Sequence, residues 1–316
     1  MGPSVTWWVG FGAGVLALLA LDLGVLHRRK RRPTGMKAAL GWTVFWVSLA
    51  VAFGAAIWLG WVGNYPVEMR GQAGLEYYTA YLVELSLSLD NVFVFAVLFR
   101  YFKVDAAHQH GVLFWGIIGA MVLRLGMILG GLALLQHFEW VLYVFGAVLL
   151  WSGWRMWHSS ETGVEPGKNP VLRWLHRYVP MSDKYDGTRF FTIQNGKRAA
   201  TPLLAVLIAL ETTDIVFAVD SVPAVLAVTR DAFVAYTSNV FAILGLRSLY
   251  FLLAGAMERF WLLHYGLAAL LAFIGTKMLV AHWVAVPLGV SFAVIFLLLG
   301  GSIAGSLLVK PRKKEA

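Results

Sequence analysis

Two apolar stretches of this chain carry acidic residues at matching positions. Residues 83–97 read VELSLSLDNVFVFAV, and residues 213–227 read TDIVFAVDSVPAVLA. Aligned without gaps, they pair two acids and one small polar residue: Glu84 with Asp214, Asp90 with Asp220, and Asn91 with Ser221. A charged side chain at the centre of a bilayer costs about 2.5–3.5 kcal/mol on an insertion scale, so such residues usually mark a functional site. The matched acids therefore predict a membrane protein that holds a cation within the bilayer.

The rest of the chain consists largely of apolar runs. Of its 316 residues, 59% are hydrophobic and only 14% are charged, whereas a soluble domain carries about 25% charged residues. Runs of 18 or more apolar residues are long enough to cross a bilayer. We predict an all-α polytopic fold with a single transmembrane domain over residues 1–316. Its spans, about nine in number, are 5–26, 38–60, 76–99, 111–135, 140–157, 201–228, 232–256, 261–281 and 284–308.

The basic residues predict the orientation of these spans. Of the 26 Lys and Arg residues, 21 fall on one side of a nine-span chain, and only Arg70 and Arg230 fall on the other. The positive-inside rule then places the N-terminus outside and the C-terminus in the cytoplasm. Orientation also accounts for the net charge of +9, so we do not expect nucleic-acid binding. The longest loop, 158–200, is predicted to be cytoplasmic and inserted between two repeats, and its Asn195-Gly196 pair predicts a β-hairpin.

The similarity between the two acidic stretches extends into a longer internal repeat. Arg124 falls on Arg247, and YVFGAVLLWSGWRM (143–156) aligns without gaps on YGLAALLAFIGTKM (265–278). The third to fifth spans therefore repeat as the sixth to eighth. Because three is an odd number, the second copy enters the membrane inverted. Inverted repeats are typical of transporters, whose substrate site lies near the midplane where the repeats meet.

Acids outnumber cations inside the predicted spans. The acids are Glu84, Asp90, Glu211, Asp214 and Asp220, with Asp22 as a candidate sixth near the end of the first span. The cations are Arg124, Arg247 and Lys277, which we interpret, together with Asp22, as candidates for gating or structural ion pairs. The surplus acids must be protonated or bound to a metal ion. Carboxylates with Asn91 and Ser221 suit Mg²⁺, Ca²⁺ or Mn²⁺, whereas zinc or copper would normally recruit imidazole or thiolate, and the chain has no cysteine.

Pro223 bears on the geometry of the second motif. It cannot donate a hydrogen bond to the carbonyl of Val219, so we expect the helix to loosen or break around Asp220. An intramembrane aspartyl protease that uses Asp90 and Asp220 is disfavoured, because the Gly-x-Gly-Asp context is missing before Asp220. We therefore expect no enzyme and no catalytic residues.

The motifs ELSLSLDNVFVF and ETTDIVFAVDSVPAVLAVT resemble the TerC family of integral membrane proteins, in particular its Alx-like branch. The resemblance continues through SNVFAILGLRSLYFLLAG and YGLAALLAFIGTKML and covers nearly the whole chain. The family is named for tellurite resistance and is grouped with LysE-type exporters, which are built on inverted three-helix repeats. The resemblance implies a metal site that draws on both motifs: Glu84, Asp90, Asn91, Glu211, Asp214, Asp220 and Ser221. Leu85 departs from the family pattern, which commonly has lysine there, and makes the predicted site more acidic.

Members of this family are associated with Mn²⁺ export across the bacterial inner membrane. The resemblance implies a secondary transporter that carries Mn²⁺ as its substrate, and the surplus of acids suggests exchange for protons. Export of Ca²⁺ or another hard divalent cation stays open, because the same oxygen ligands serve these ions. A membrane partner that assists the metalation or assembly of exported proteins also stays open, although the short predicted outer loops count against it.

The orientation can be tested with reporter fusions. A reporter fused after Ala316 is expected to be active only in the cytoplasm, and one inserted in the 61–75 loop only outside. Fusions to both positions that report the same side of the membrane would contradict the nine-span count and the inverted repeat.

Overall fold

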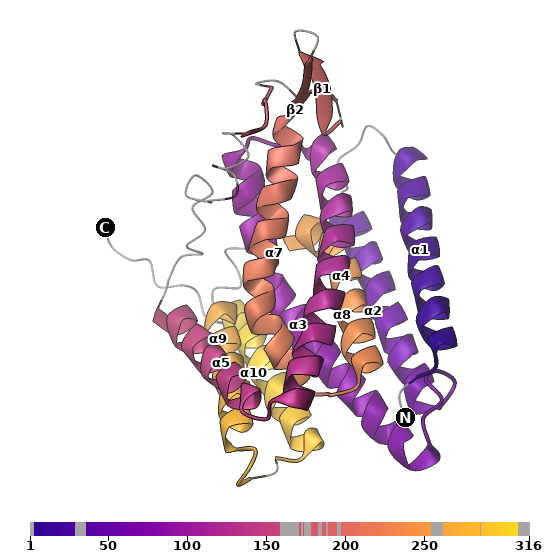
Figure 1. The fold of residues 1–316 in the computed structure, drawn as a ribbon, viewed down its shortest axis with the longest axis vertical. Helices are drawn as coiled ribbons and strands as arrows, with labels where there is room; N and C mark the ends of the chain where they lie inside the picture. The colour runs from indigo at the N-terminus through magenta and orange to yellow at the C-terminus, as the bar shows by residue number, and fades with distance from the viewer. Residues whose placement is uncertain are drawn as a thin grey trace.

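The fold is described from a computed structural model that covers residues 3–28, 36–158, 171, 173, 178–182, 185–187, 189–194, 197–253, 262–284 and 286–308. Within these ranges the side chains of residues 22–28, 90, 93, 106–107, 197 and 253 are not described. This part of the chain forms nine helices and one hairpin (Figure 1): α1 (Val5–Arg28), α2 (Met36–Trp58), α3 (Val67–Tyr101), α4 (Ala106–His137), α5 (Val141–His158), β1 (Phe191–Gln194), β2 (Lys197–Ala200), α7 (Pro202–Leu226), α8 (Ala232–Leu253), α9 (Leu263–Val280) and α10 (Leu288–Leu308).

The prediction of an all-α membrane fold is confirmed. Each of the nine predicted spans coincides with one helix. Seven of the helices in the described ranges are long and apolar enough to cross a membrane: α2, α3, α4, α7, α8, α9 and α10. In α1 the described apolar stretch, Val5–Leu21, is shorter. The largest difference from the predicted bounds is at α3, which begins at Val67 because Pro66 precedes a helical segment that extends beyond the apolar run.

The central helices pack in pairs that match the predicted repeat. α3 packs against α8, α4 packs against α7, and α5 packs against α9. In the repeat, α3, α4 and α5 correspond to α7, α8 and α9. Exchanging each helix for its counterpart therefore converts the α3–α8 pair into the α7–α4 pair and maps the α5–α9 pair onto itself. This is the arrangement that a two-fold axis between inverted repeats requires, and the repeat itself stays a prediction.

The α5–α9 contact involves small residues at two crossing points. A Cβ at Gly153 would lie 2.9 Å from the carbonyl oxygen of Ala268, and a Cβ at Gly275 would lie 2.8 Å from that of Gly146. In the gapless repeat alignment Gly153 corresponds to Gly275, and Gly146 corresponds to Ala268. The two crossing points are therefore equivalent under the exchange of repeats. Small residues let helix backbones approach closely inside a membrane, where dispersion forces drive association.

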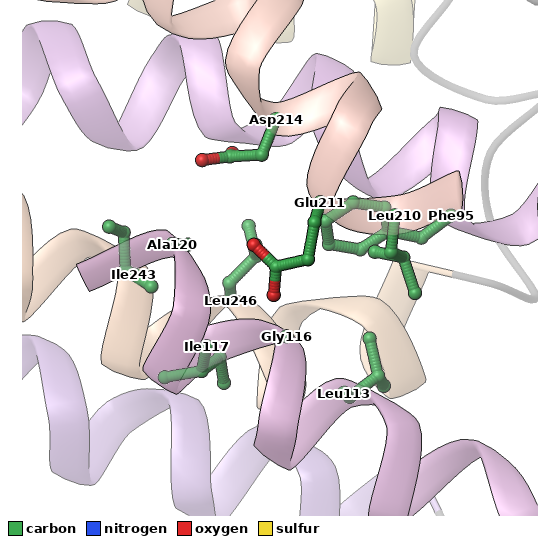
Figure 2. A pocket seen from close by; sticks show the side chains of 10 residues that line it. All are labelled: Phe95, Leu113, Gly116, Ile117, Ala120, Leu210, Glu211, Asp214, Ile243 and Leu246. Atoms are coloured by element: carbon green, nitrogen blue, oxygen red, sulfur yellow. The ribbon is translucent and has the colours of Figure 1, made fainter. Parts of the chain in front are cut away.

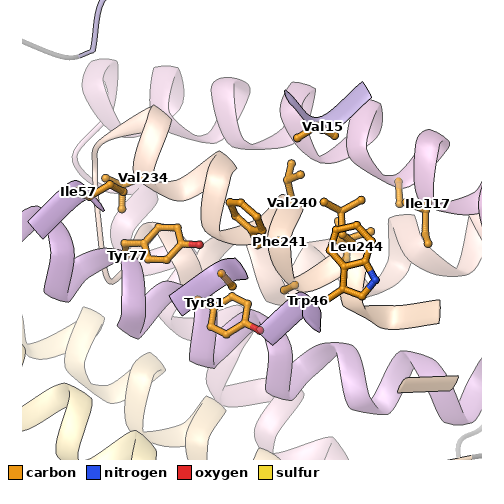
Figure 3. Close-up of a cluster of buried hydrophobic side chains, with 14 of the residues drawn as sticks. Val15, Trp46, Ile57, Tyr77, Tyr81, Ile117, Val234, Val240, Phe241 and Leu244 are labelled. Atoms are coloured by element: carbon orange, nitrogen blue, oxygen red, sulfur yellow. The ribbon is translucent and has the colours of Figure 1, made fainter. Parts of the chain in front are cut away.

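The remaining helices flank this bundle. Figure 1 shows α1 and α2 on one side of the α3–α4–α7–α8 group and α5, α9 and α10 on the other. Aromatic side chains fill the interface of α1, α2, α3 and α8, where Tyr77 and Tyr81 of α3 lie beside Phe241 of α8 and Trp46 of α2 (Figure 3). Tilted ring contacts such as Phe53–Phe241, whose centroids lie 5.0 Å apart, stabilise this packing.

A polar network ties the start of α8 to α3. Asp231 caps α8 by accepting hydrogen bonds from the N–H groups of Phe233 (2.8 Å) and Val234 (3.1 Å). The Tyr65 hydroxyl donates to Asp231 Oδ2 at 2.9 Å, and burial together with the Asp231 charge raises the pKa of Tyr65, which keeps it a donor. Thr229 Oγ1 donates to Glu76 Oε2 of α3 at 2.6 Å. This end of the bundle lies opposite the hairpin in Figure 1.

Two local predictions have different outcomes. The hairpin is confirmed, since β1 and β2 are antiparallel with Gln194 opposite Lys197, as a two-residue connection requires. The expected break at Pro223 is wrong, because α7 is continuous from Pro202 to Leu226. Pro223 lies in the last turn and forgoes only its own hydrogen bond to the Val219 carbonyl, while the Ala227 N–H still donates to the Pro223 carbonyl at 2.9 Å. Of the 158–200 loop, residues 159–170, 172, 174–177, 183–184 and 188 lie outside the described ranges, as does the Asn195-Gly196 pair itself.

The close approach of α5 and α9 predicts a position-dependent effect of alanine. Gly153→Ala and Gly275→Ala should each destabilise the protein by about 1–3 kcal/mol, because the new methyl group would collide with a backbone carbonyl. Gly126→Ala in α4 is the control, since no heavy atom lies within 4 Å of the added Cβ. Thermal unfolding of the detergent-purified variants measures the difference. Equal melting temperatures for all three would contradict the tight packing.

Candidate functional site

Arg124 of α4 lies between the two acidic motifs and contacts both. Its Nη1 pairs with Glu84 Oε1 of α3. Its Nε and Nη2 donate to the two oxygens of Asp214 of α7, at 3.2 and 3.0 Å, in a two-pronged pair. Nη1 also lies 3.2 Å from Ser221 Oγ. One guanidinium thus joins three residues of the predicted metal site and connects α3, α4 and α7.

This cluster is shielded from solvent and lipid. The exposed fractions are 1% for Arg124, 0% for Glu84 and 5% for Asp214. Ser88 Oγ lies 3.4 Å from Glu84 Oε1, whereas Glu84 Oε2 has no hydrogen-bond partner in the described residues. Burying an ion pair is favourable only when its geometry is good and its remaining polar atoms find partners. The ion pair with Asp214 has good geometry, whereas Glu84 retains an oxygen without a partner.

Glu211 faces a small cavity one helical turn from Asp214. The cavity has a volume of about 20 Å³, enough for a water molecule or a bare metal ion. Figure 2 shows the Glu211 carboxylate pointing toward α4 and α8, among Gly116, Ile117 and Leu246. Glu211 Oε2 has no hydrogen-bond partner in the part of the chain that the structure describes. Glu211 is half-buried, and a carboxylate oxygen buried without a partner is stable only when the group carries a proton or holds a cation.

A glycine makes room for this carboxylate. A Cβ at Gly119 of α4 would overlap the carboxylate of Glu211, whereas a Cβ at Gly116, three residues earlier, would meet only Leu207 Cδ1 at 4.0 Å. Gly119 was not among the residues that the sequence singled out. Its role depends on which helix lies opposite Glu211, and no spacing along the chain gives that information.

Asp220 points to a different neighbour from Asp214. It accepts a hydrogen bond of 2.6 Å from Ser152 Oγ of α5, and the charge of Arg155 on the same helix acts on it. The two acids of the second motif therefore contact different helices: Asp214 contacts α4, and Asp220 contacts α5. Six residues of regular helix turn the second acid about 120° from the first, and the continuity of α7 preserves that angle.

The other predicted residues are placed only in part. The side chains of Asp90 and Asp22 lie outside the described residues, and Asn91 is buried in α3. Leu85, at the position of the family lysine, packs against apolar side chains. Within the described ranges, no group of three or more His, Asp or Glu side chains is close enough to hold a metal ion. In this conformation Arg124, rather than a set of carboxylates, fills the space between Glu84 and Asp214.

The two remaining cations have charged or titratable neighbours on other helices. The charge of Arg247 acts on His110 of α4, and Lys277 of α9 lies near enough to Glu76 for their charges to interact. Glu76, like Ser152, was not identified from the sequence as a polar partner.

Asn239 of α8 was also not predicted as a site residue. It is 0% exposed, and neither of its amide atoms has a partner in the described residues. Leaving a buried amide without a hydrogen-bond partner costs free energy. An asparagine within a predicted membrane span was therefore a signal in the sequence that could have identified this residue.

The chain is similar to known membrane proteins over most of its length. The model of the integral membrane protein TerC family matches residues 69–314, from the start of α3 to beyond α10. Membrane protein STKORF319 of Myxococcus xanthus is 48% identical over 301 residues, which cover 95% of this chain and 92% of the relative. Alx of Escherichia coli (strain K12), described as a candidate membrane-bound redox modulator, is 48% identical over 296 residues, with 92% and 90% covered.

A membrane protein of Rickettsia bellii is 39% identical over 303 residues, which cover 96% of this chain and 97% of the relative. No solved structure matches the chain. The family match includes both acidic motifs and Arg124. The chain belongs to the TerC family of integral membrane proteins.

Proposed function

We propose that this membrane protein exports divalent cations, with Mn²⁺ as its principal substrate, in exchange for protons. The observation that carries the proposal is the surplus of buried acids around one guanidinium. Glu84 and Asp214 pair with Arg124, and Glu211 lines a small cavity together with Asp214. Among the described residues, Glu84 Oε2 and Glu211 Oε2 have no hydrogen-bond partner. A site of this kind binds a cation or takes up protons, and it can alternate between the two.

The donor atoms support a hard divalent ion. Carboxylate oxygens and the hydroxyl of Ser221 meet at the interface of α3, α4 and α7. Oxygen ligands of this type suit Mn²⁺, Mg²⁺ and Ca²⁺. The cavity beside Glu211 has room for an ion but not for an organic solute. Ca²⁺ is the closest competitor for these ligands, so selectivity is part of the test.

The charge distribution supports the proposed orientation, because the positive-inside rule favours a cytoplasmic side for the basic hairpin loop and C-terminus. In this orientation, protons that enter from outside would drive the export of the metal ion. The relatives described as candidate redox modulators do not supply a thiol mechanism for this chain, because it contains no cysteine.

Substitutions on α7 and α4 test the proposal in proteoliposomes loaded with Mn²⁺ or Ca²⁺. Glu211→Gln keeps the shape of the side chain but can neither bind a cation strongly nor carry a proton, so Mn²⁺ flux should fall to the level of empty vesicles. Gly119→Ala should also lower the flux, because the added methyl group displaces the Glu211 carboxylate.

Two variants serve as controls. Gly126→Ala lies on the same helix, is not among the residues that line the cavity, and should transport like the parent, since no heavy atom lies within 4 Å of its Cβ. Glu68→Gln removes an exposed acid from the start of α3 and should have no effect. Mn²⁺ transport by Glu211→Gln at the parental rate would contradict the role of this carboxylate. If the parent transports Ca²⁺ faster than Mn²⁺, the principal substrate is Ca²⁺ and not Mn²⁺.

A further inference from the structure

Arg124 occupies the position between the two motifs that a bound divalent cation would take. Its nitrogens contact oxygens of Glu84, Asp214 and Ser221. All three residues belong to the predicted ligand set, and they come from both motif helices. A guanidinium and a metal ion compete for the space between the same two carboxylates, because both need the oxygens that face that space and their positive charges repel.

The ion pairs leave part of the negative charge unbalanced. One guanidinium carries a single positive charge against the two carboxylates of Glu84 and Asp214. Glu84 Oε2 has no partner in the described residues although the side chain is 0% exposed. A divalent cation would balance both carboxylates and engage the free oxygen. The site is therefore able to bind an ion of higher charge than the one that the protein itself supplies.

We propose that Arg124 is a resident cation that competes with the transported ion for Glu84 and Asp214. The inference rests on the proposed export function and describes how the same site is regulated. The arriving ion displaces the guanidinium from at least one carboxylate, and the returning guanidinium helps to displace the ion. Arg124 is thus a positioning residue that lowers the affinity for the metal ion enough to permit its release.

A purely structural ion pair leads to the opposite expectation. If Arg124 only joined α3, α4 and α7, its removal would loosen the helices that present the ligands, and metal binding would weaken. Competition predicts that removal strengthens binding. The direction of the change in affinity therefore separates the two roles, whereas loss of transport alone would not.

Mn²⁺ binding to the purified full-length protein, measured by titration calorimetry, tests the competition. Arg124→Gln should bind Mn²⁺ about tenfold or more tightly than the parent, within the usual 5- to 150-fold range of coupling between sites, and should export it more slowly. Arg124→Lys keeps the charge but loses the two-pronged contact with Asp214, so its affinity should lie between those of the parent and the glutamine variant. Arg100→Gln removes an exposed cation from the last turn of α3 and serves as the matched control.

The possible results separate this inference from the proposed function. If the parent neither binds nor transports a divalent cation, the export function is wrong and the inference is lost with it. If the parent transports Mn²⁺ but folded Arg124→Gln binds it equally or more weakly, only the competition is wrong. Should Arg124→Gln fail to fold, Arg124→Lys decides the question, and an affinity at or below that of the parent overturns the proposal.

Discussion

The ion pairs of Arg124 with Glu84 and Asp214 are the interaction on which the centre of this protein depends. Each acid is buried on a different motif helix, and neither could remain ionised inside the bundle without a cation. Because Arg124 comes from α4, one guanidinium fixes α3 and α7 relative to a third helix. The packing of α3 on α8 and of α4 on α7 then continues outward from this contact.

Polar contacts connect the two repeats at the centre of the packing. The α5–α9 crossing treats the two repeats alike, with glycine against a small residue at both points. Arg124 pairs with an acid from each repeat, and Asp220 accepts a hydrogen bond from Ser152 of α5. Glu211 has Asp214 as its charged neighbour and faces a small cavity.

The sequence predicted the parts of the structure that periodicity and local chemistry determine. The nine helices follow from apolar runs, and the hairpin follows from Asn195-Gly196. On a regular helix, Asp214 and Asp220 lie about 120° apart and so face different neighbours. Spacing could not show which helix lies opposite each face, so the pairing of Arg124 with two acids and the space at Gly119 emerged only from the fold. The expected break at Pro223 failed because the position of a proline within its helix determines its effect.

Recording both fluxes in the same proteoliposomes tests whether the protein exchanges a divalent cation for protons. Mn²⁺ entry is followed with a quenched dye, and a pH dye on the opposite side of the membrane reports protons, with and without an imposed pH gradient. If the protein is an antiporter, protons move against Mn²⁺ and the gradient accelerates the flux. Mn²⁺ flux that ignores the gradient and moves no protons would contradict antiport and leave the protein a facilitator.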